Sequence, residues 1–138
     1  MQVLIDCDVL LDVVLGREPF LADSAAVVAW AVDHPGSAAV AWHTLSNLAY
    51  LTSDDARGFM RDLLRHVEVA PVGTAQAVQA LSLPMADVED ALQAAAALAF
   101  RAEHIVTRNL RDYRNSPVPA ISPRQFAAEV LGRSGITS

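Results

Sequence analysis

Short, mainly apolar runs alternate with amphipathic stretches along the chain. The apolar runs lie at residues 3–5, 38–41, 67–72, 104–107 and 118–121. Runs of this kind are typical of strands that are buried on both faces of a parallel sheet. The segments between them carry apolar residues at helical spacing. This alternation predicts an α/β fold, a three-layer α/β/α sandwich with a central parallel sheet of four or five strands.

Polar residues that favour helix starts mark where the helices between the strands are expected to begin. The first helix is expected at residues 8–15 with Asp8 as its cap, and the second at residues 20–33. Further caps are expected at the starts of the later helices, at Thr44, Ser53, Thr74, Asp87 and Ser122. Gly132 is expected to end the last helix. We therefore predict a single domain over residues 1–132 and a loose C-terminal tail over residues 133–138.

Composition narrows the class of protein. No apolar run approaches the length of a membrane span, no basic segment precedes the first apolar run, and Cys7 is the single cysteine. We expect a cytoplasmic protein with no membrane contact and no internal disulfide. The net charge of −6 argues against electrostatic capture of nucleic acid over the whole surface. However, all ten basic residues are arginines, which suit phosphate, and four of them lie close together: Arg101, Arg108, Arg111 and Arg114.

Carboxylates follow the first apolar run. Asp6 comes directly after residues 3–5, and ligands of parallel sheets bind beyond the carboxyl ends of the strands. Asp8 and Asp12 follow at helical spacing, where two like charges are unfavourable unless a cation or a donor lies nearby. We expect Asp6 to be a ligand, Asp8 to cap the helix at the rim of the site, and Asp12 to bind an arginine or support the site.

Two later segments bring further oxygen atoms. Asp87 is explained as a helix cap, but Asp90 opens a helix that is apolar nearly all round, where a carboxylate needs an arginine, a hydrogen-bond network or a metal. After the fourth apolar run, Thr107, Asn109 and Asp112 offer oxygen atoms at the same edge of the sheet. Oxygen ligands without a His/Cys cluster favour Mg²⁺ or Mn²⁺. An acidic pocket with a divalent cation and nearby arginines suits a phosphodiester substrate.

The three motifs occur in an order that resembles the PIN-domain family. They are Asp6-Cys7-Asp8-Val9-Leu10-Leu11-Asp12, Asp87-Val88-Glu89-Asp90-Ala91-Leu92 and Ile105-Val106-Thr107-Arg108-Asn109, followed by Asp112-Tyr113. The segment 116–126 resembles the ending of one branch, which carries Thr-Arg-Asn and Ser-Pro-x-Pro motifs. Members of the family are mostly Mg²⁺- or Mn²⁺-dependent ribonucleases, and many are VapC-type toxins of bacterial toxin–antitoxin pairs.

The resemblance implies a site and partners. Asp6, Asp90 and Asp112 would be the catalytic metal ligands, assisted by Asn47 and Asn109, which stand where the family usually has carboxylates. Asp8, Asp87 and Thr107 would support the site, and Arg108 and Arg111 would bind RNA. The implied partners are RNA, an antitoxin whose tail blocks the pocket, and a second copy of the chain.

Two alternatives remain open at this point. Because amides replace two carboxylates, at Asn47 and Asn109, the chain could be a PIN-like module that binds RNA or a partner and cleaves poorly. Asp6-Cys7-Asp8 also matches the Asp-x-Asp signature of haloacid-dehalogenase-type phosphatases. That chemistry usually needs a glycine after the second aspartate and a lysine, whereas this chain has Val9 and no lysine.

Overall fold

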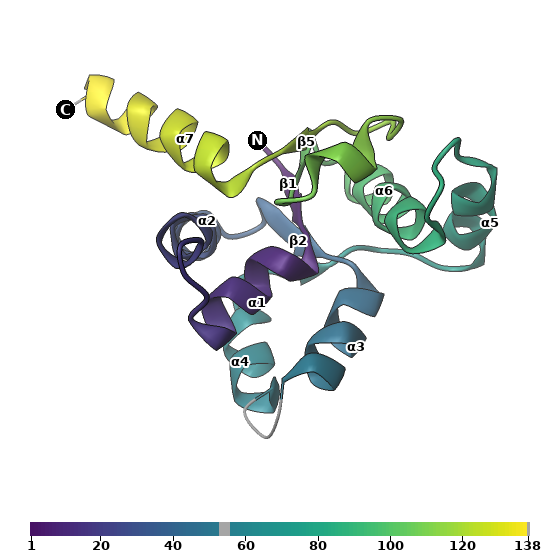
Figure 1. Cartoon of the computed structure of the whole chain (residues 1–138), viewed down its shortest axis with the longest axis horizontal. Helices are drawn as coiled ribbons and strands as arrows, with labels where there is room; N and C mark the ends of the chain where they lie inside the picture. Colours follow the sequence, from purple (N-terminus) through teal and green to yellow (C-terminus); the bar gives the residue numbers. More distant parts are fainter. Residues whose placement is uncertain (53–55, 138) are drawn as a thin grey trace.

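Five parallel strands form the sheet in the described part of the chain, which covers residues 1–52 and 56–137 of the computed structural model. The strands are β1 (Val3–Ile5), β2 (Ala38–Val40), β3 (Glu68–Val69), β4 (His104–Val106) and β5 (Ala120–Ile121). Their order in the sheet is β3-β2-β1-β4-β5, so β1 lies in the centre (Figure 1). In the register, Leu4 pairs with Ala39 on one side and with Ile105 on the other. The predicted α/β fold with a parallel sheet is confirmed.

Helices connect the strands and cover both faces of the sheet. They are α1 (Cys7–Leu15), α2 (Leu21–Asp33), α3 (Trp42–Leu51), α4 (Ala56–Leu63), α5 (Thr74–Ser82), α6 (Val88–Phe100) and α7 (Pro123–Thr137), with the short 3₁₀ helix η1 (Leu110–Tyr113) after β4. No helix in residues 1–52 and 56–137 is long and apolar enough to cross a membrane.

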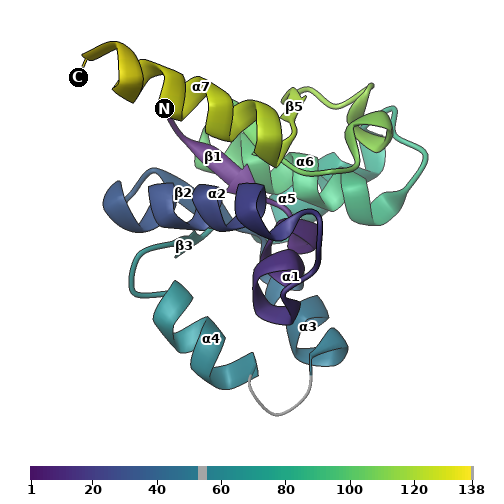
Figure 2. The same cartoon turned by 60° about the vertical axis from the view of Figure 1, so that its left-hand side comes forward.

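Alternate side chains of β1 point into two separate cores. Val3 and Ile5 pack in a core with Val27 of α2 and Phe126 of α7. Leu4 faces the opposite core, which contains the alanines of α6, and α5 lies outside α6 (Figure 2). Small side chains let α6 approach the sheet closely. The first turn of α6 is thereby brought to the carboxyl end of β1.

The first helix begins one residue earlier than predicted. Asp6 is the N-cap of α1, and its Oδ1 accepts the backbone N–H of Cys7 at 2.7 Å. The expectation that Asp8 caps this helix is therefore wrong: Asp8 lies in the first turn and accepts a hydrogen bond from another segment. The chain turns into α1 directly at the end of β1, so the carboxylate that ends the strand also satisfies the start of the helix.

Two other predicted caps are also wrong, and one lies outside the described residues. Thr44 is buried within α3, which begins at Trp42 because β2 leads into it without a loop. Thr74 is the first residue of α5, and the N–H of the preceding Gly73 donates to the Gln76 side chain at 2.8 Å. Asp87 is the N-cap of α6, as predicted. Ser53 falls outside the described residues.

Gly132 does not end the last helix. α7 continues to Thr137, across most of the segment that was expected to be a loose tail. Gly132 has no positive φ, and a glycine in an exposed helical position costs only about 1 kcal/mol relative to alanine. A glycine ends a helix when the chain needs a left-handed residue there, and no such turn follows here.

Candidate active site

The carboxyl ends of β1 and β4 meet at one edge of the sheet because the two strands are neighbours. They bring Asp6 and Asp8 next to Thr107, Arg108 and Asn109. A cavity of about 270 Å³ opens at this edge. Its lining combines the ends of both strands with α1, α3 and α6: Asp6, Cys7, Asp8, Leu11, Arg17, Asn47, Leu51, Glu89, Asp90, Arg108 and Asn109. Five of the predicted metal-ligating or supporting residues therefore surround one space, namely Asp6, Asp8, Asn47, Asp90 and Asn109.

Asp6 is buried and receives four hydrogen bonds. Its Oδ1 accepts the N–H of Cys7 at 2.7 Å and the Nε2 of Gln93 at 2.6 Å. Its Oδ2 accepts the hydroxyls of Thr107 at 2.8 Å and Tyr113 at 3.3 Å. Two donors on each oxygen occupy all the usual acceptor positions of a carboxylate. Asp6 is thus held rigidly, and a cation would have to compete with a protein donor for either oxygen.

Asp8 has one oxygen without a partner. Its Oδ2 accepts the backbone N–H of Arg108 at 3.0 Å, which ties the start of α1 to the end of β4. Its Oδ1 is buried and has no hydrogen-bond partner among the described residues. Burial, followed by the charge of Asp6, raises the pKa of Asp8 to about 6. A buried, unpaired carboxylate oxygen beside a second carboxylate is a position that favours a cation.

Asp90 faces other carboxylates from the first turn of α6. Burial, and then the charges of Asp87, Asp112 and Asp6, raise the pKa of Asp90 to about 6. Asp90 lies between the first cavity and a second one of about 260 Å³. The second cavity contains Asp87, Arg111 and Asp112. Asp112 thus lies beside Asp90 in the neighbouring cavity and does not line the first.

Asn47 is paired with the carboxylate of Glu89, for which the sequence predicted no role in the site. Its Nδ2 donates to Oε1 of Glu89 at 2.8 Å, across from α3 to α6. Glu89 lines the first cavity together with Asn47 and Asp90. A carboxylate is therefore present beside the amide of Asn47, contributed by the neighbouring helix.

The guanidinium group of Arg108 is occupied inside the protein. Its Nε and Nη2 donate to the two oxygens of Asp12, at 2.9 Å and 3.1 Å. The Nε of Arg17 and the hydroxyl of Ser24 bind the same carboxylate, each at 2.9 Å. Asp12, for which an arginine partner was expected, therefore has two, Arg17 and Arg108. Arg111, by contrast, is exposed at the rim of the second cavity.

Sequence reasoning did not identify Gln93 and Tyr113, although both bind Asp6 directly. Gln93 had a signal, since it is the one polar residue in the apolar stretch 91–100. Cys7 lines the cavity, but burial and then the charges of Asp6 and Asp8 raise the pKa of its thiol to about 12. Cys7 is therefore a packing residue, because its thiolate form is suppressed at neutral pH.

The donor chemistry of this edge fits a hard divalent cation. The available side-chain donors are oxygens, one of them the unpaired Oδ1 of Asp8. Burial and neighbouring carboxylates raise the pKa of both Asp8 and Asp90, so a cation would be favourable beside them. The described residues nevertheless contain no group of three His, Cys, Asp or Glu side chains already arranged around one point as metal ligands. A cation would have to draw Asp8 and Asp90 together.

Comparisons with known proteins agree on one fold. A family model described as PIN domain matches residues 2–111. A chain in a toxin–antitoxin complex from Klebsiella pneumoniae is similar with a TM-score of 0.67 and 19% identity, over 88% of this chain and 98% of that one. A chain of VapBC2 from Rickettsia felis, bound to a DNA fragment from its promoter, is similar with a TM-score of 0.66 and 13% identity, over 88% and 98%. FitAcB from Neisseria gonorrhoeae gives a TM-score of 0.60 and 14% identity, over 89% and 99%. No curated protein matches the chain by sequence.

Proposed function

We propose that this chain, which belongs to the PIN-domain family, is a Mg²⁺- or Mn²⁺-dependent endoribonuclease and the toxin of a toxin–antitoxin pair. The observation that carries the proposal is the carboxylate pair Asp8 and Asp90. Both line one open cavity, and both have a raised pKa because they are partly buried beside other carboxylates. Carboxylates that destabilise the folded chain in this way are typical of functional sites.

Each predicted residue has a role that its position supports. Asp6, Asp90 and Asp112 would hold the cation, with Asn47 and Asn109 as neutral oxygen donors, and Asp8 would supply its open Oδ1. When bound, Mg²⁺ or Mn²⁺ neutralises charge on the phosphate and makes an attacking water more acidic. Glu89 adds a negative charge beside Asn47, which offsets the amide at that position.

Other residues would orient the ligands and the RNA. The hydroxyl of Thr107 holds Asp6, and the side chain of Asp87 caps the helix that presents Asp90. Arg111 is free to attract the RNA backbone at the rim, where it lies beside Asp90 and Asp112. Arg108 would act by fixing the loop that carries Asn109, because its guanidinium group is bound to Asp12.

A second candidate function is an RNA- or partner-binding module with little cleavage. Two observations favour it: the amides Asn47 and Asn109 in the cavity, and the absence of a ready-made carboxylate cage among the described residues. The phosphatase hypothesis has no support beyond Asp6-Cys7-Asp8, and the PIN-domain match covers that motif.

The structures of relatives suggest partners. The similar chain from K. pneumoniae belongs to a toxin–antitoxin complex, and VapBC2 from R. felis is bound to a DNA fragment from its promoter. We propose that this chain likewise binds a small antitoxin over the cavity and pairs with a second copy. Any contact with promoter DNA would then be made by the antitoxin, since this chain carries a net charge of −6.

One assay separates the candidates. Purified protein is incubated with single-stranded RNA or with a generic phosphomonoester, in Mn²⁺, Mg²⁺ or EDTA, beside the variants Asp90→Asn and Asp62→Asn. We expect RNA cleavage that EDTA abolishes and that Asp90→Asn lowers by more than about 100-fold, the upper end for residues that only support a metal ligand. Asp62→Asn, an exposed change on α4, should cleave like the wild type.

The other outcomes have distinct meanings. RNA binding without cleavage in either metal would support the binding module. Cleavage that persists in EDTA would contradict a metal-dependent mechanism. Phosphomonoester turnover that is lost in Asp6→Asn would revive the phosphatase hypothesis.

A further inference from the structure

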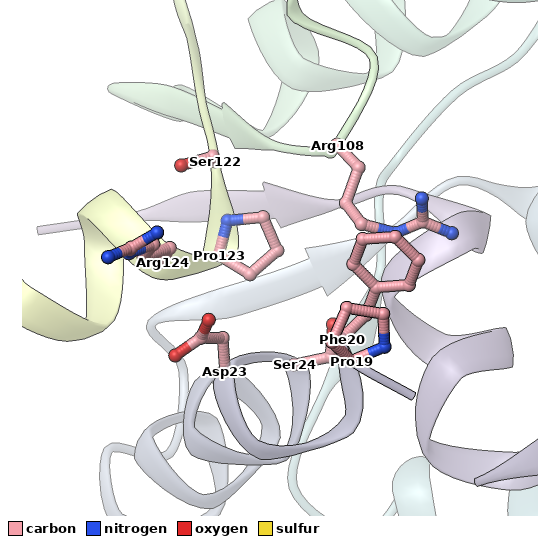
Figure 3. Close-up of a pocket in the computed structure, with 8 residues that line it drawn as sticks. All are labelled: Pro19, Phe20, Asp23, Ser24, Arg108, Ser122, Pro123 and Arg124. Carbon is pink, nitrogen blue, oxygen red and sulfur yellow. The ribbon is translucent and has the colours of Figure 1, made fainter. Parts of the chain in front are cut away.

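A separate cavity of about 420 Å³ lies beside the candidate active site, and the proposed mechanism does not use it. It is enclosed by the loop after α1, the first turn of α2, the end of β4 and the start of α7 (Figure 3). Its lining residues are Pro19, Phe20, Asp23, Ser24, Arg108, Ser122, Pro123 and Arg124. The volume is enough for a small planar ligand such as a nucleobase with its sugar.

Arg108 forms the wall between this cavity and the candidate active site, since it lines both. Its backbone N–H binds Oδ2 of Asp8 at 3.0 Å. Its guanidinium carbon lies 3.8 Å from the centre of the Phe20 ring, on the other side. The two cavities thus share Arg108, so a polymer that occupied both would pass this residue.

The walls of this cavity are flat and apolar. Figure 3 shows the Pro123 ring on one side of the open space and the rings of Phe20 and Pro19 on the other. Phe20 is 38% exposed although it is a large apolar side chain. Flat apolar surfaces of this kind stack on the faces of nucleobases irrespective of sequence.

Charged groups of both signs lie farther out in the same cavity. Arg124 is exposed and Asp23 is half-buried, and neither makes an ion pair or hydrogen bond with another described residue. A free guanidinium group is a good partner for a phosphate. A free carboxylate accepts hydrogen bonds from the exocyclic amino group of a base. Together with the flat walls, these two groups match the parts of a nucleotide.

We propose that this cavity binds the nucleotide next to the scissile phosphate of a single-stranded RNA. The base would lie between Phe20 and Pro123, the adjoining phosphate beside Arg124, and the cleaved bond beside Asp90 in the other cavity. The inference rests on the proposed ribonuclease function. It adds a second contact region for the substrate, and it gives Arg108 the role of a fixed wall between two successive nucleotides.

The test measures RNA binding and not cleavage. Fluorescence anisotropy in EDTA at low ionic strength compares a labelled RNA hexamer with a hexamer of the same backbone that lacks bases. The variants are Phe20→Leu, which removes the ring, and Arg124→Ala, which removes the exposed cation. Arg65→Ala, an exposed arginine between α4 and β3, is the matched control for charge.

Each variant has its own expected signature. The wild type should bind the normal hexamer at least about 5-fold more tightly than the base-free one, and Phe20→Leu should remove most of that difference. Arg124→Ala should lower the affinity for both hexamers about 3- to 10-fold. It should also reduce the salt dependence of binding by the equivalent of about one phosphate contact. Arg65→Ala should bind both ligands like the wild type.

The possible failures are distinguishable. If RNA binds but Phe20→Leu and Arg124→Ala leave its affinity unchanged, this cavity is not a nucleotide site, although RNA remains the substrate. That result is also expected if the cavity receives a side chain of a protein partner. If the wild type binds no RNA, both the cavity proposal and the proposed RNA substrate are overturned. Melting temperatures of both variants show that they are folded.

Discussion

Asp8 has one carboxylate oxygen with a hydrogen-bond partner and one without in the described part of the chain. One of its oxygens is bound by the N–H of Arg108, while the other is buried without a partner among the described residues. Burial and the charge of Asp6, another carboxylate, raise the pKa of Asp8. Ionised Asp8 therefore destabilises the folded chain.

The first prediction concerns pH. The pKa of Asp8 is about 6 in the folded chain and 3.8 ordinarily, so the folded state binds the proton more tightly. The free energy of unfolding in EDTA should therefore fall as pH rises from about 4 to about 6. Asp8→Asn cannot ionise, so its melting temperature at pH 7.5 should exceed that of the wild type by a few degrees, because each pKa unit corresponds to about 1.4 kcal/mol.

Thermal unfolding at pH 4.5 and pH 7.5 checks this prediction. The difference between the two pH values should be smaller in Asp8→Asn than in the wild type, and Asp62→Asn should behave like the wild type. A lower melting temperature for Asp8→Asn at pH 7.5 would mean that its hydrogen bond from Arg108 outweighs the electrostatic penalty.

Gln93 occupies one acceptor position of Asp6. It is 2% exposed, and its Nε2 donates to Oδ1 of Asp6 at 2.6 Å. Its own Oε1 has no partner among the described residues, so the side chain is held by this one bond. Without that donor, Oδ1 of Asp6 would have a free acceptor position.

The second prediction follows from this competition. Gln93→Met keeps the shape of the side chain and removes the donor. In EDTA the variant should unfold at a lower temperature, because a hydrogen bond to a charged group contributes about 1.5–3 kcal/mol. Addition of Mn²⁺ should raise the melting temperature more in the variant than in the wild type, since the free oxygen binds the cation more tightly. An equal rise in both proteins would show that Gln93 does not limit metal binding.

At the scale of elements, Asp12 joins α1 to the segment after β4. Asp12 is fully buried, and it binds Arg108 from the segment after β4 and Arg17 from the loop after its own helix. The hydrogen bond from Ser24 adds α2 to the same cluster. One carboxylate thus holds three segments that surround the candidate active site.

The third prediction tests this junction. Asp12→Ala leaves two guanidinium groups without their carboxylate, so we expect a loss of about 3–5 kcal/mol in the free energy of unfolding. Arg17→Ala should cost less, because Arg17 is the more exposed of the two arginines and Arg108 still neutralises Asp12. Urea unfolding of both variants measures the difference. Equal losses would contradict a central role for Asp12.

At the scale of the whole molecule, α5 leaves an apolar face uncovered. Val78 is 63% exposed and Leu81 is 73% exposed. Exposed Trp42 of α3 lines a cavity together with Gln76 and Ala77 of α5. Large exposed apolar side chains on one element are characteristic of surfaces that bind another protein.

The fourth prediction assigns this face to the second copy of the chain. The wild type should have a mass of about twice 14.7 kDa at micromolar concentration, and Leu81→Asp should shift it towards the monomer. Leu64→Asp, at an exposed leucine that follows α4, is the matched control and should leave the mass unchanged. Light scattering after size-exclusion chromatography gives the masses. A wild-type monomer, or a dimer that survives Leu81→Asp, would contradict the assignment.

The order of strands and helices was predictable because each depends on short-range pattern. Residues 3–5 and 104–107 are apolar runs that end in polar groups, and adjacent parallel strands bring such ends together. Asp90 could be singled out because it interrupts an otherwise apolar helix. These inferences need only the local spacing of apolar and polar residues and the direction of the chain.

The partners of each side chain were decided only in three dimensions. Arg108 meets Asp12 across 96 positions, and Gln93 meets Asp6 across 87, so no local pattern could indicate either pair. The same is true of Asp112, which lines the cavity beside that of Asp6, with Asp90 lining both. The residue types of the chain therefore determined where carboxylates gather, whereas the packing of α1, α6 and the segment after β4 decided which oxygens are free. The physical reason is that a hydrogen bond depends on position to within a fraction of an ångström, and that precision arises only when the layers pack.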